Sequence, residues 1–156
     1  MEKKTEQTEV MSIPQIQLIY VSGKSDGPKV QIKEPHIAYE AFKQSWNART
    51  IELVMELKVM YLNNAAEVLG IYPVSSGGRE KANIDPRVIF AGALIHAATN
   101  IIVCVNHPSG KLEVSEQTRA FANKLKNGGK LLEIELTDFL VISQEGYKSF
   151  TEIGLL

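Results

Sequence analysis

Hydrophobic residues recur along the chain in two patterns of spacing, one typical of strands and one typical of helices. Short apolar runs rich in β-branched residues predict five strands. These runs are residues 51–62, 68–74, 101–105, 134–142 and 147–150. The first two runs flank Asn63 and Asn64, so we expect them to form a β-hairpin. The uninterrupted run 101–105 is typical of a strand buried on both faces, and a weaker strand is expected over 15–21, at an edge of the sheet.

The helical spacing begins after Pro35, where Tyr39, Phe42 and Trp46 recur at steps of three and four residues. This spacing places three rings on one side of a helix that ends near Asn47. We expect that side to face the core.

Two further helices have recognisable ends. Asp85 and Pro86 supply the N-cap and a first-turn proline for a helix that runs to about residue 98. Ser115 caps another helix, which the Asn-Gly-Gly sequence at 127–129 is expected to close, since glycine tolerates a positive φ there. The expected buried side of the first of these two helices consists of Ile89, Phe90, Ala93, Leu94 and Ala97.

Strands and helices are mixed along the chain, which predicts an α/β fold with a mixed sheet. An apolar fraction of 44% in 156 residues is enough to fill the core of one domain. The first residues are polar and without periodicity. We therefore expect a disordered tail over 1–12 and a single domain over 13–156.

Charge and cysteine content exclude several classes of protein. Seventeen Lys and Arg residues nearly balance 18 Asp and Glu residues, so the net charge of −1 provides no general attraction for nucleic acid or membranes. The single cysteine, Cys104, cannot form an internal disulfide, and the N-terminus has no apolar core like that of a signal peptide. We expect a soluble, cytoplasmic protein.

The residues that could carry chemistry follow the buried run 101–105. Asn106-His107-Pro108-Ser109-Gly110 lies between that strand and the helix capped by Ser115, where α/β folds commonly place a site. Together with YLNNAAEVLG, GGKLLEIEL and YKSF, this segment resembles the RadC-like branch of the JAB/MPN (JAMM) family. The resemblance covers the chain from about Tyr39 to its end. It implies a three-layer, deaminase-like sandwich with a mixed sheet between helices.

The resemblance also implies a zinc metallohydrolase site. Such proteins carry His-x-His at a strand end, followed by a serine and then an aspartate in the next helix, and the two histidines and the aspartate bind zinc. Water takes the fourth position. A glutamate from an earlier strand acts as general base on that water, and the serine helps to hold the oxyanion.

Most of these positions are changed in this chain. The first histidine corresponds to Val105, the second to His107, the serine to Ser115, the aspartate to Thr118 and the glutamate to Met55. The family also often has histidine where this chain has Phe139. Two of three metal ligands and the base are therefore missing, and we expect no bound zinc. His107 is expected to be an inherited loop histidine bonded to nearby backbone, and Ser115 a residual oxyanion position.

Nearby residues offer weak substitutes. Glu52 and Glu56 lie close to Met55 in the sequence, and Glu56 is a weak candidate base, although strand alternation turns it away from the side that Met55 faces. Cys104 is a potential zinc ligand by its chemistry, but it is expected on the opposite face from His107. We interpret it as a small core residue.

Three functions remain open at this point. The first is a catalytically impaired homologue that binds an unknown protein or peptide partner through the old substrate groove or a sheet edge. The second is an active, zinc-dependent hydrolase of the (iso)peptidase type with altered ligands. The third is a DNA-binding protein associated with DNA repair, suggested by the resemblance and by a modest basic surface. That surface would consist of Lys111, Arg119, Lys124, Lys126 and Lys130.

Overall fold

The computed structural model describes residues 12–17, 19, 27–78 and 84–156. Three helices and five strands follow one another in these parts of the chain. The helices are α1 (Pro35–Ser45), α2 (Pro86–Ile95) and α3 (Glu116–Leu132). The strands are β1 (Glu56–Leu62), β2 (Val68–Ser76), β3 (Asn100–Asn106), β4 (Glu135–Ile142) and β5 (Tyr147–Ser149).

The strands form one mixed sheet in the order β2-β1-β3-β4-β5. β1 and β2 form the expected antiparallel hairpin, β1 also pairs antiparallel with β3, and β4 pairs antiparallel with β5. Only β3 and β4 run parallel, because α3 connects them as a crossover. β3 is therefore the central strand, as its uninterrupted apolar run predicts.

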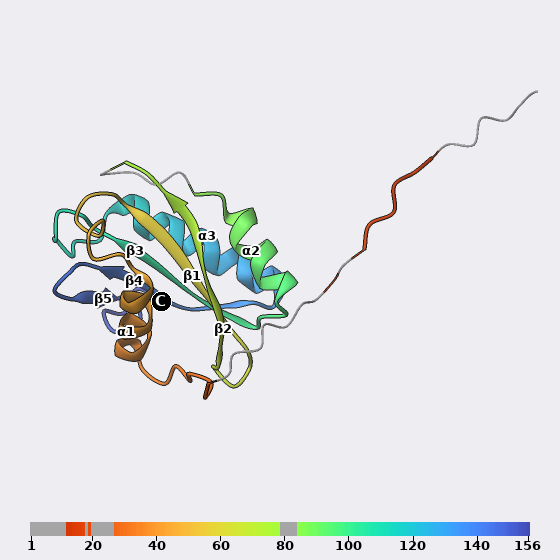
Figure 1. The fold of residues 1–156 in the computed structure, drawn as a ribbon, viewed down its shortest axis with the longest axis horizontal. Helices are drawn as coiled ribbons and strands as arrows, with labels where there is room; N and C mark the ends of the chain where they lie inside the picture. The colour runs from red at the N-terminus through yellow and green to blue at the C-terminus, as the bar shows by residue number, and fades with distance from the viewer. Residues whose placement is uncertain (1–11, 18, 20–26, 79–83) are drawn as a thin grey trace, which may run out of the picture.

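Helices cover both faces of the sheet, which makes three layers (Figure 1). On one face, Ala38, Tyr39 and Phe42 of α1 pack against Met60, Ile102 and other residues of the sheet. On the opposite face, α2 and α3 contribute a second cluster, which includes the following buried residues: Ile89, Phe90, Ala93, Ala122 and Leu125. The predicted α/β sandwich with a mixed sheet between helices is confirmed.

Helix α2 is shorter than its sequence pattern predicts. Asp85 caps it as expected, because its carboxylate accepts the backbone N–H of Arg87 at 2.9 Å. The helix ends at Ile95, and Ala97 has a φ of +51° that turns the chain toward β3. The predicted burial of Leu94 and Ala97 was wrong, since Leu94 is 59% exposed and Ala97 is also exposed. Ala98 is buried instead.

Helix α3 is longer than predicted, and the expected end at residues 127–129 was wrong. The helix continues through both glycines to Leu132, and Glu133 adopts the left-handed conformation that ends it. A Cβ atom at Gly129 would collide with the carbonyl oxygen of Ile134, and one at Gly128 would lie 3.2 Å from the ring of Phe90. These glycines therefore serve close packing rather than helix termination.

Two strand predictions also need correction. Residues 51–54 form a turn, so that β1 begins only at Glu56. In the predicted strand over 15–21, the described residues 15–17 and 19 belong to no strand, and Ile16 is 91% exposed. Residues 18, 20 and 21 lie outside the described residues, as do residues 1–11 of the expected tail. Without a paired neighbour, strand propensity alone does not make residues 15–17 and 19 a strand.

The described helices include none that combines the length and the apolar character needed to cross a bilayer.

The close approach at Gly129 generates a stability prediction. Replacing glycine by alanine inside a helix normally stabilises a protein. Gly129→Ala should instead lower the free energy of unfolding by about 1–3 kcal/mol, because the new methyl group must displace the backbone at Ile134. Urea unfolding measures this change. Asn127→Ala, at an exposed position of the same helix, is the control and should be neutral or slightly stabilising; a stabilised Gly129→Ala protein would contradict the packing argument.

Candidate metal centre

The end of β3 is tied to the segment before β1 by the side chain of Asn106. This residue is fully buried, and its amide nitrogen donates to the carbonyl oxygens of Ile51 (2.7 Å) and Val54 (2.9 Å). Its amide oxygen accepts the backbone N–H of Glu56 at 2.6 Å. Because these bonds join residues 50 or more positions apart, they place the start of β1 beside the end of β3, where the motif lies.

His107 follows directly and is held by backbone contacts. Its N–H donates to the carbonyl of Ile142 at the end of β4 (2.9 Å), and its carbonyl accepts the N–H of Gly110 (3.0 Å), which has a φ of +80°. The ring atom Nδ1 lies 2.9 Å from the carbonyl oxygen of Lys111. A carbonyl only accepts, so in the neutral ring Nδ1 carries the proton and Nε2 keeps its lone pair. His107 thus retains the tautomer of a metal-binding histidine.

Ser115 and Thr118 form the N-terminal cap of α3. The Ser115 hydroxyl accepts the backbone N–H of Thr118 at 3.1 Å, and the two hydroxyl oxygens lie 2.9 Å apart. This is the ordinary geometry of a serine N-cap. The Thr118 side chain therefore contacts Ser115, at the position that the resemblance assigns to a metal-binding aspartate.

Val105 and Met55, which the resemblance assigns to a zinc ligand and to the general base, are apolar. Val105 is 5% exposed and belongs to the core cluster under α2 and α3, and Met55 packs against that same cluster. The backbone of Met55 is paired with the glycine-rich end of the hairpin, since its N–H donates to the Gly78 carbonyl at 2.8 Å. Val105 and Met55 thus lie on the same side of the sheet, Val105 inside the core and Met55 partly buried against it.

The nearby acidic residues lie elsewhere. Glu56 precedes the core residue Leu57 and follows Met55, so alternation turns it to the α1 side, where the Ser76 hydroxyl donates to it at 3.4 Å. Glu52 is exposed in the turn before β1. The structure therefore does not bring the weak candidate base Glu56 to the side of Val105.

Cys104 lies on the opposite face, as strand alternation predicts. It belongs to the cluster beneath α1, whereas its neighbour Val105 belongs to the other cluster. Complete burial raises the pKa of the Cys104 thiol well above its usual value, because the thiolate would be desolvated. Cys104 is a core residue and offers no thiolate to His107.

In β4, an apolar residue again stands where the resemblance predicts a polar one. Phe139 packs edge to face on Phe121 and tilted on Phe150, with ring centroids 6.4 and 4.9 Å apart. Its neighbour Asp138 is buried, accepts the hydroxyl of Ser149 at 2.5 Å and the N–H of Thr151 at 3.1 Å, and so ties β4 to β5. Asp138 is thus a structural carboxylate.

The donor set does not fit a zinc ion. One imidazole nitrogen, Nε2 of His107, is available, while a valine, a methionine and a capping threonine occupy the other positions. Tetrahedral zinc sites need three or four nitrogen, sulfur or carboxylate ligands. Within residues 12–17, 19, 27–78 and 84–156, no three His, Cys, Asp or Glu side chains are grouped so as to hold a metal.

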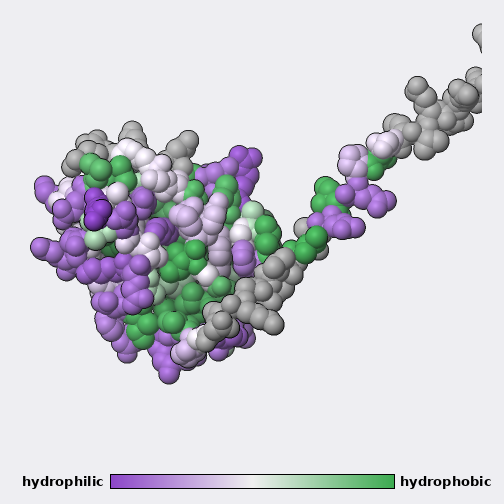
Figure 2. All heavy atoms as spheres, viewed as in Figure 1, coloured by the Kyte–Doolittle hydropathy of each residue, from purple (hydrophilic) through white to green (hydrophobic). Residues whose placement is uncertain are grey.

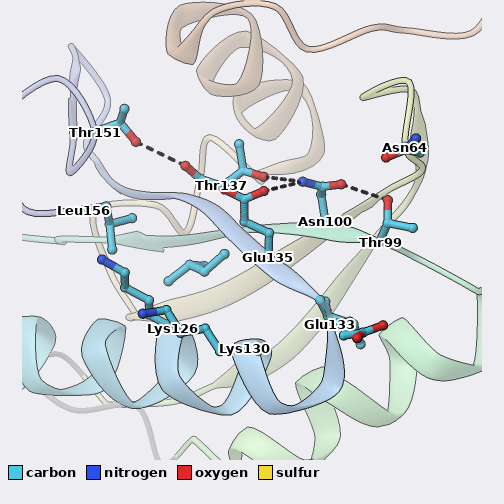
Figure 3. Close-up of a pocket in the computed structure, with 13 residues that line it drawn as sticks. Asn64, Thr99, Asn100, Lys126, Lys130, Glu133, Glu135, Thr137, Thr151 and Leu156 are labelled. Atoms are coloured by element: carbon cyan, nitrogen blue, oxygen red, sulfur yellow. Dashed lines mark hydrogen bonds between the residues drawn. The ribbon is translucent and has the colours of Figure 1, made fainter.

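Sequence reasoning missed the structural role of Asn106, which it interpreted only as part of a turn. A polar residue that ends an apolar run was the available signal, since a buried amide must find hydrogen-bond partners. It also missed an open groove of about 920 Å³ at the opposite end of β3, around Thr99 and Asn100 (Figure 3). Nothing in the sequence pattern brings these segments together.

Two of the five residues of the expected basic surface line this groove. Lys126 and Lys130 of α3 line it together with Glu133 and Glu135, and Asn100 donates to Thr137 across its floor at 3.1 Å. Figure 3 shows the two lysines on the helix side and Glu135 on the strand side. Mixed charge of this kind differs from the continuous basic face that nucleic-acid binding requires.

Comparison with known proteins places these observations in a family. The family model of the RadC-like JAB domain matches residues 32–155. A UPF0758 protein of Flavobacterium johnsoniae is 35% identical over 100 residues, which are 64% of this chain and 44% of that protein. A UPF0758 protein of Symbiobacterium thermophilum is 32% identical over 128 residues, 82% of this chain and 53% of that protein. The chain spans about half the length of these curated relatives.

The buried amide of Asn106 generates a second stability prediction. Asn106→Ala leaves two carbonyl groups and one N–H without their partner in a buried place, so the free energy of unfolding should fall by roughly 3 kcal/mol. Denaturant unfolding of Asn123→Ala, an exposed asparagine on α3, should give a change within about 0.5 kcal/mol. Equal stabilities of the two variants would show that Asn106 does not hold the segment before β1.

Proposed function

Given that the chain belongs to the RadC-like JAB domain family, we propose that it is a catalytically impaired member that acts as a binding or scaffold module. The observation that carries the proposal is that Val105 is buried in the core and Met55 packs partly buried against it, at the positions that the resemblance assigns to a zinc ligand and to the general base. A valine side chain offers no donor atom to a zinc ion, and a methionine thioether does not act as a general base. A zinc ligand and the general base that this hydrolytic chemistry needs are therefore missing in this chain.

The residues of the motif that this chain keeps are those that shape its backbone. Asn106 anchors the strand end, Gly110 permits the turn, and Ser115 caps α3. Each has a structural reason to persist without catalysis. A rigid surface with a defined turn is also what a module needs in order to recognise a protein or peptide partner.

An active hydrolase with altered ligands is the competing proposal. The free Nε2 of His107 is the one feature that favours it, because the tautomer suits a metal ligand. Such a site would need two more donors from outside the positions described above. The two proposals differ in a single measurable quantity, the amount of zinc bound per chain.

Zinc content is therefore the first experiment. Protein purified with zinc present and then dialysed should hold far less than one zinc per chain, as measured by elemental analysis. A stoichiometric site of micromolar or tighter affinity that disappears in His107→Ala would overturn the proposal. His96→Ala is the matched control, since His96 is an exposed histidine at the end of α2 whose ring contacts the Gly92 carbonyl.

Restoring the missing ligands tests the correspondence of positions. Val105→His combined with Thr118→Asp should create zinc binding, because His107 is already held in the appropriate tautomer. Zinc should then raise the melting temperature of the double variant and leave that of the native chain unchanged. Addition of Met55→Glu tests whether hydrolysis of a peptide or isopeptide bond returns. A double variant that folds but does not respond to zinc would show that the positions are wrongly matched.

A further inference from the structure

The strand β2 leaves one edge of the sheet open in the described part of the chain. It pairs with β1 on one side, and on its other side only residues 30–32 approach its beginning. There Val68 donates its N–H to the Val30 carbonyl at 2.8 Å, and Ile32 donates to the Ala66 carbonyl at 2.9 Å. No described residue pairs with the outer edge of β2 beyond Val68.

The open edge is apolar on both faces of the sheet. Leu69 and Val74 pack partly buried against the cluster under α2 and α3, whereas Val68 and Ile71 do so against the cluster under α1. Tyr72 is 45% exposed, and the space beside the α carbon of Gly70 is empty. Pro73 lacks an N–H and limits regular pairing to the stretch before it. An added strand would thus fit beside residues 69–72.

The segment 12–17 has the complementary properties. Its two isoleucines are large apolar residues that face solvent, with Ile13 and Ile16 exposed by 75% and 91%. Figure 1 shows this part of the chain leading away from the domain, and Figure 2 shows apolar side chains among polar ones along it. Apolar residues at 13 and 16 point to opposite faces of a strand, which matches an edge with apolar residues on both faces.

We propose that the segment 12–17 of one copy adds as a strand to the β2 edge, residues 69–72, of a second copy, so that the chain forms an exchanged dimer. Within one copy, none of the described residues covers either surface. Contact between two copies covers both, and the backbone hydrogen bonds of the open edge are completed at the same time. The pairing of residues 30–32 shows that this edge already accepts an extended segment at its start.

The oligomeric state tests this proposal in the full chain. Sedimentation between about 1 and 100 μM should show a concentration-dependent dimer. Ile13→Asp with Ile16→Asp should weaken that dimer at least tenfold without changing the melting of the domain. Leu131→Asp is the matched control, because Leu131 is 86% exposed at the end of α3, and it should leave the dimer intact. A native chain that stays monomeric, or a dimer that survives in the double variant, would overturn the proposal.

Crosslinking distinguishes a second copy from the chain's own segment. An Ile16→Cys protein is mixed with a Tyr72→Cys protein under mild oxidation by oxygen with a copper catalyst, and disulfides between residues 16 and 72 are counted by mass spectrometry. We expect at least ten times more of this disulfide than in a mixture of Leu131→Cys and Tyr72→Cys. Cys104 does not interfere, since it is buried. A link that forms only when both cysteines are in one chain would assign the edge to the chain's own segment and refute the exchange.

Discussion

The arrangement of the motif depends on one buried amide. Asn106 is the last residue of β3, and its side chain bonds to three backbone groups of the segment 51–56. An unpaired amide in that position would cost more than the bonds themselves contribute, so the segment must pass where Asn106 can reach it. Because Met55 lies inside that segment, its position relative to Val105 and His107 follows from the same bonds.

The residues that hold the backbone in place differ from the residues at the proposed ligand positions. The turn at Gly110, the cap at Ser115 and the anchor at Asn106 act on the backbone, and none of them needs a metal to be satisfied. The proposed ligand and base positions would act through side chains, and by the proposed correspondence they hold valine, threonine, methionine and phenylalanine in this chain. Phe139 shows that the change also serves packing, since its ring joins β4 to α3 and to Phe150. The core thus includes space that a catalytic site would keep polar.

The surfaces left for binding lie at different places on the molecule. The turn after β3 carries His107, the groove around Asn100 lies at the other end of the same strand, and the open edge of β2 lies along the side of the sheet. If a second copy occupies the β2 edge, a foreign partner must use one of the remaining surfaces. The association with DNA suggested by the resemblance stays a hypothesis, because Lys126 and Lys130 share their groove with two glutamates.

The sequence alone determined the features that depend on local physics. The order of strands and helices, the caps at Asp85 and Ser115, the central place of β3 and the opposite faces of Cys104 and Val105 follow from periodicity, capping and alternation. Only the tertiary structure decided where α3 ends, because Gly129 is chosen for contact with Ile134 and not for a local turn. It also decided that residues 15–17 and 19 lack a partner strand and that Asn106 reaches Ile51 and Val54. Contacts between distant segments set these outcomes, and no local pattern encodes them.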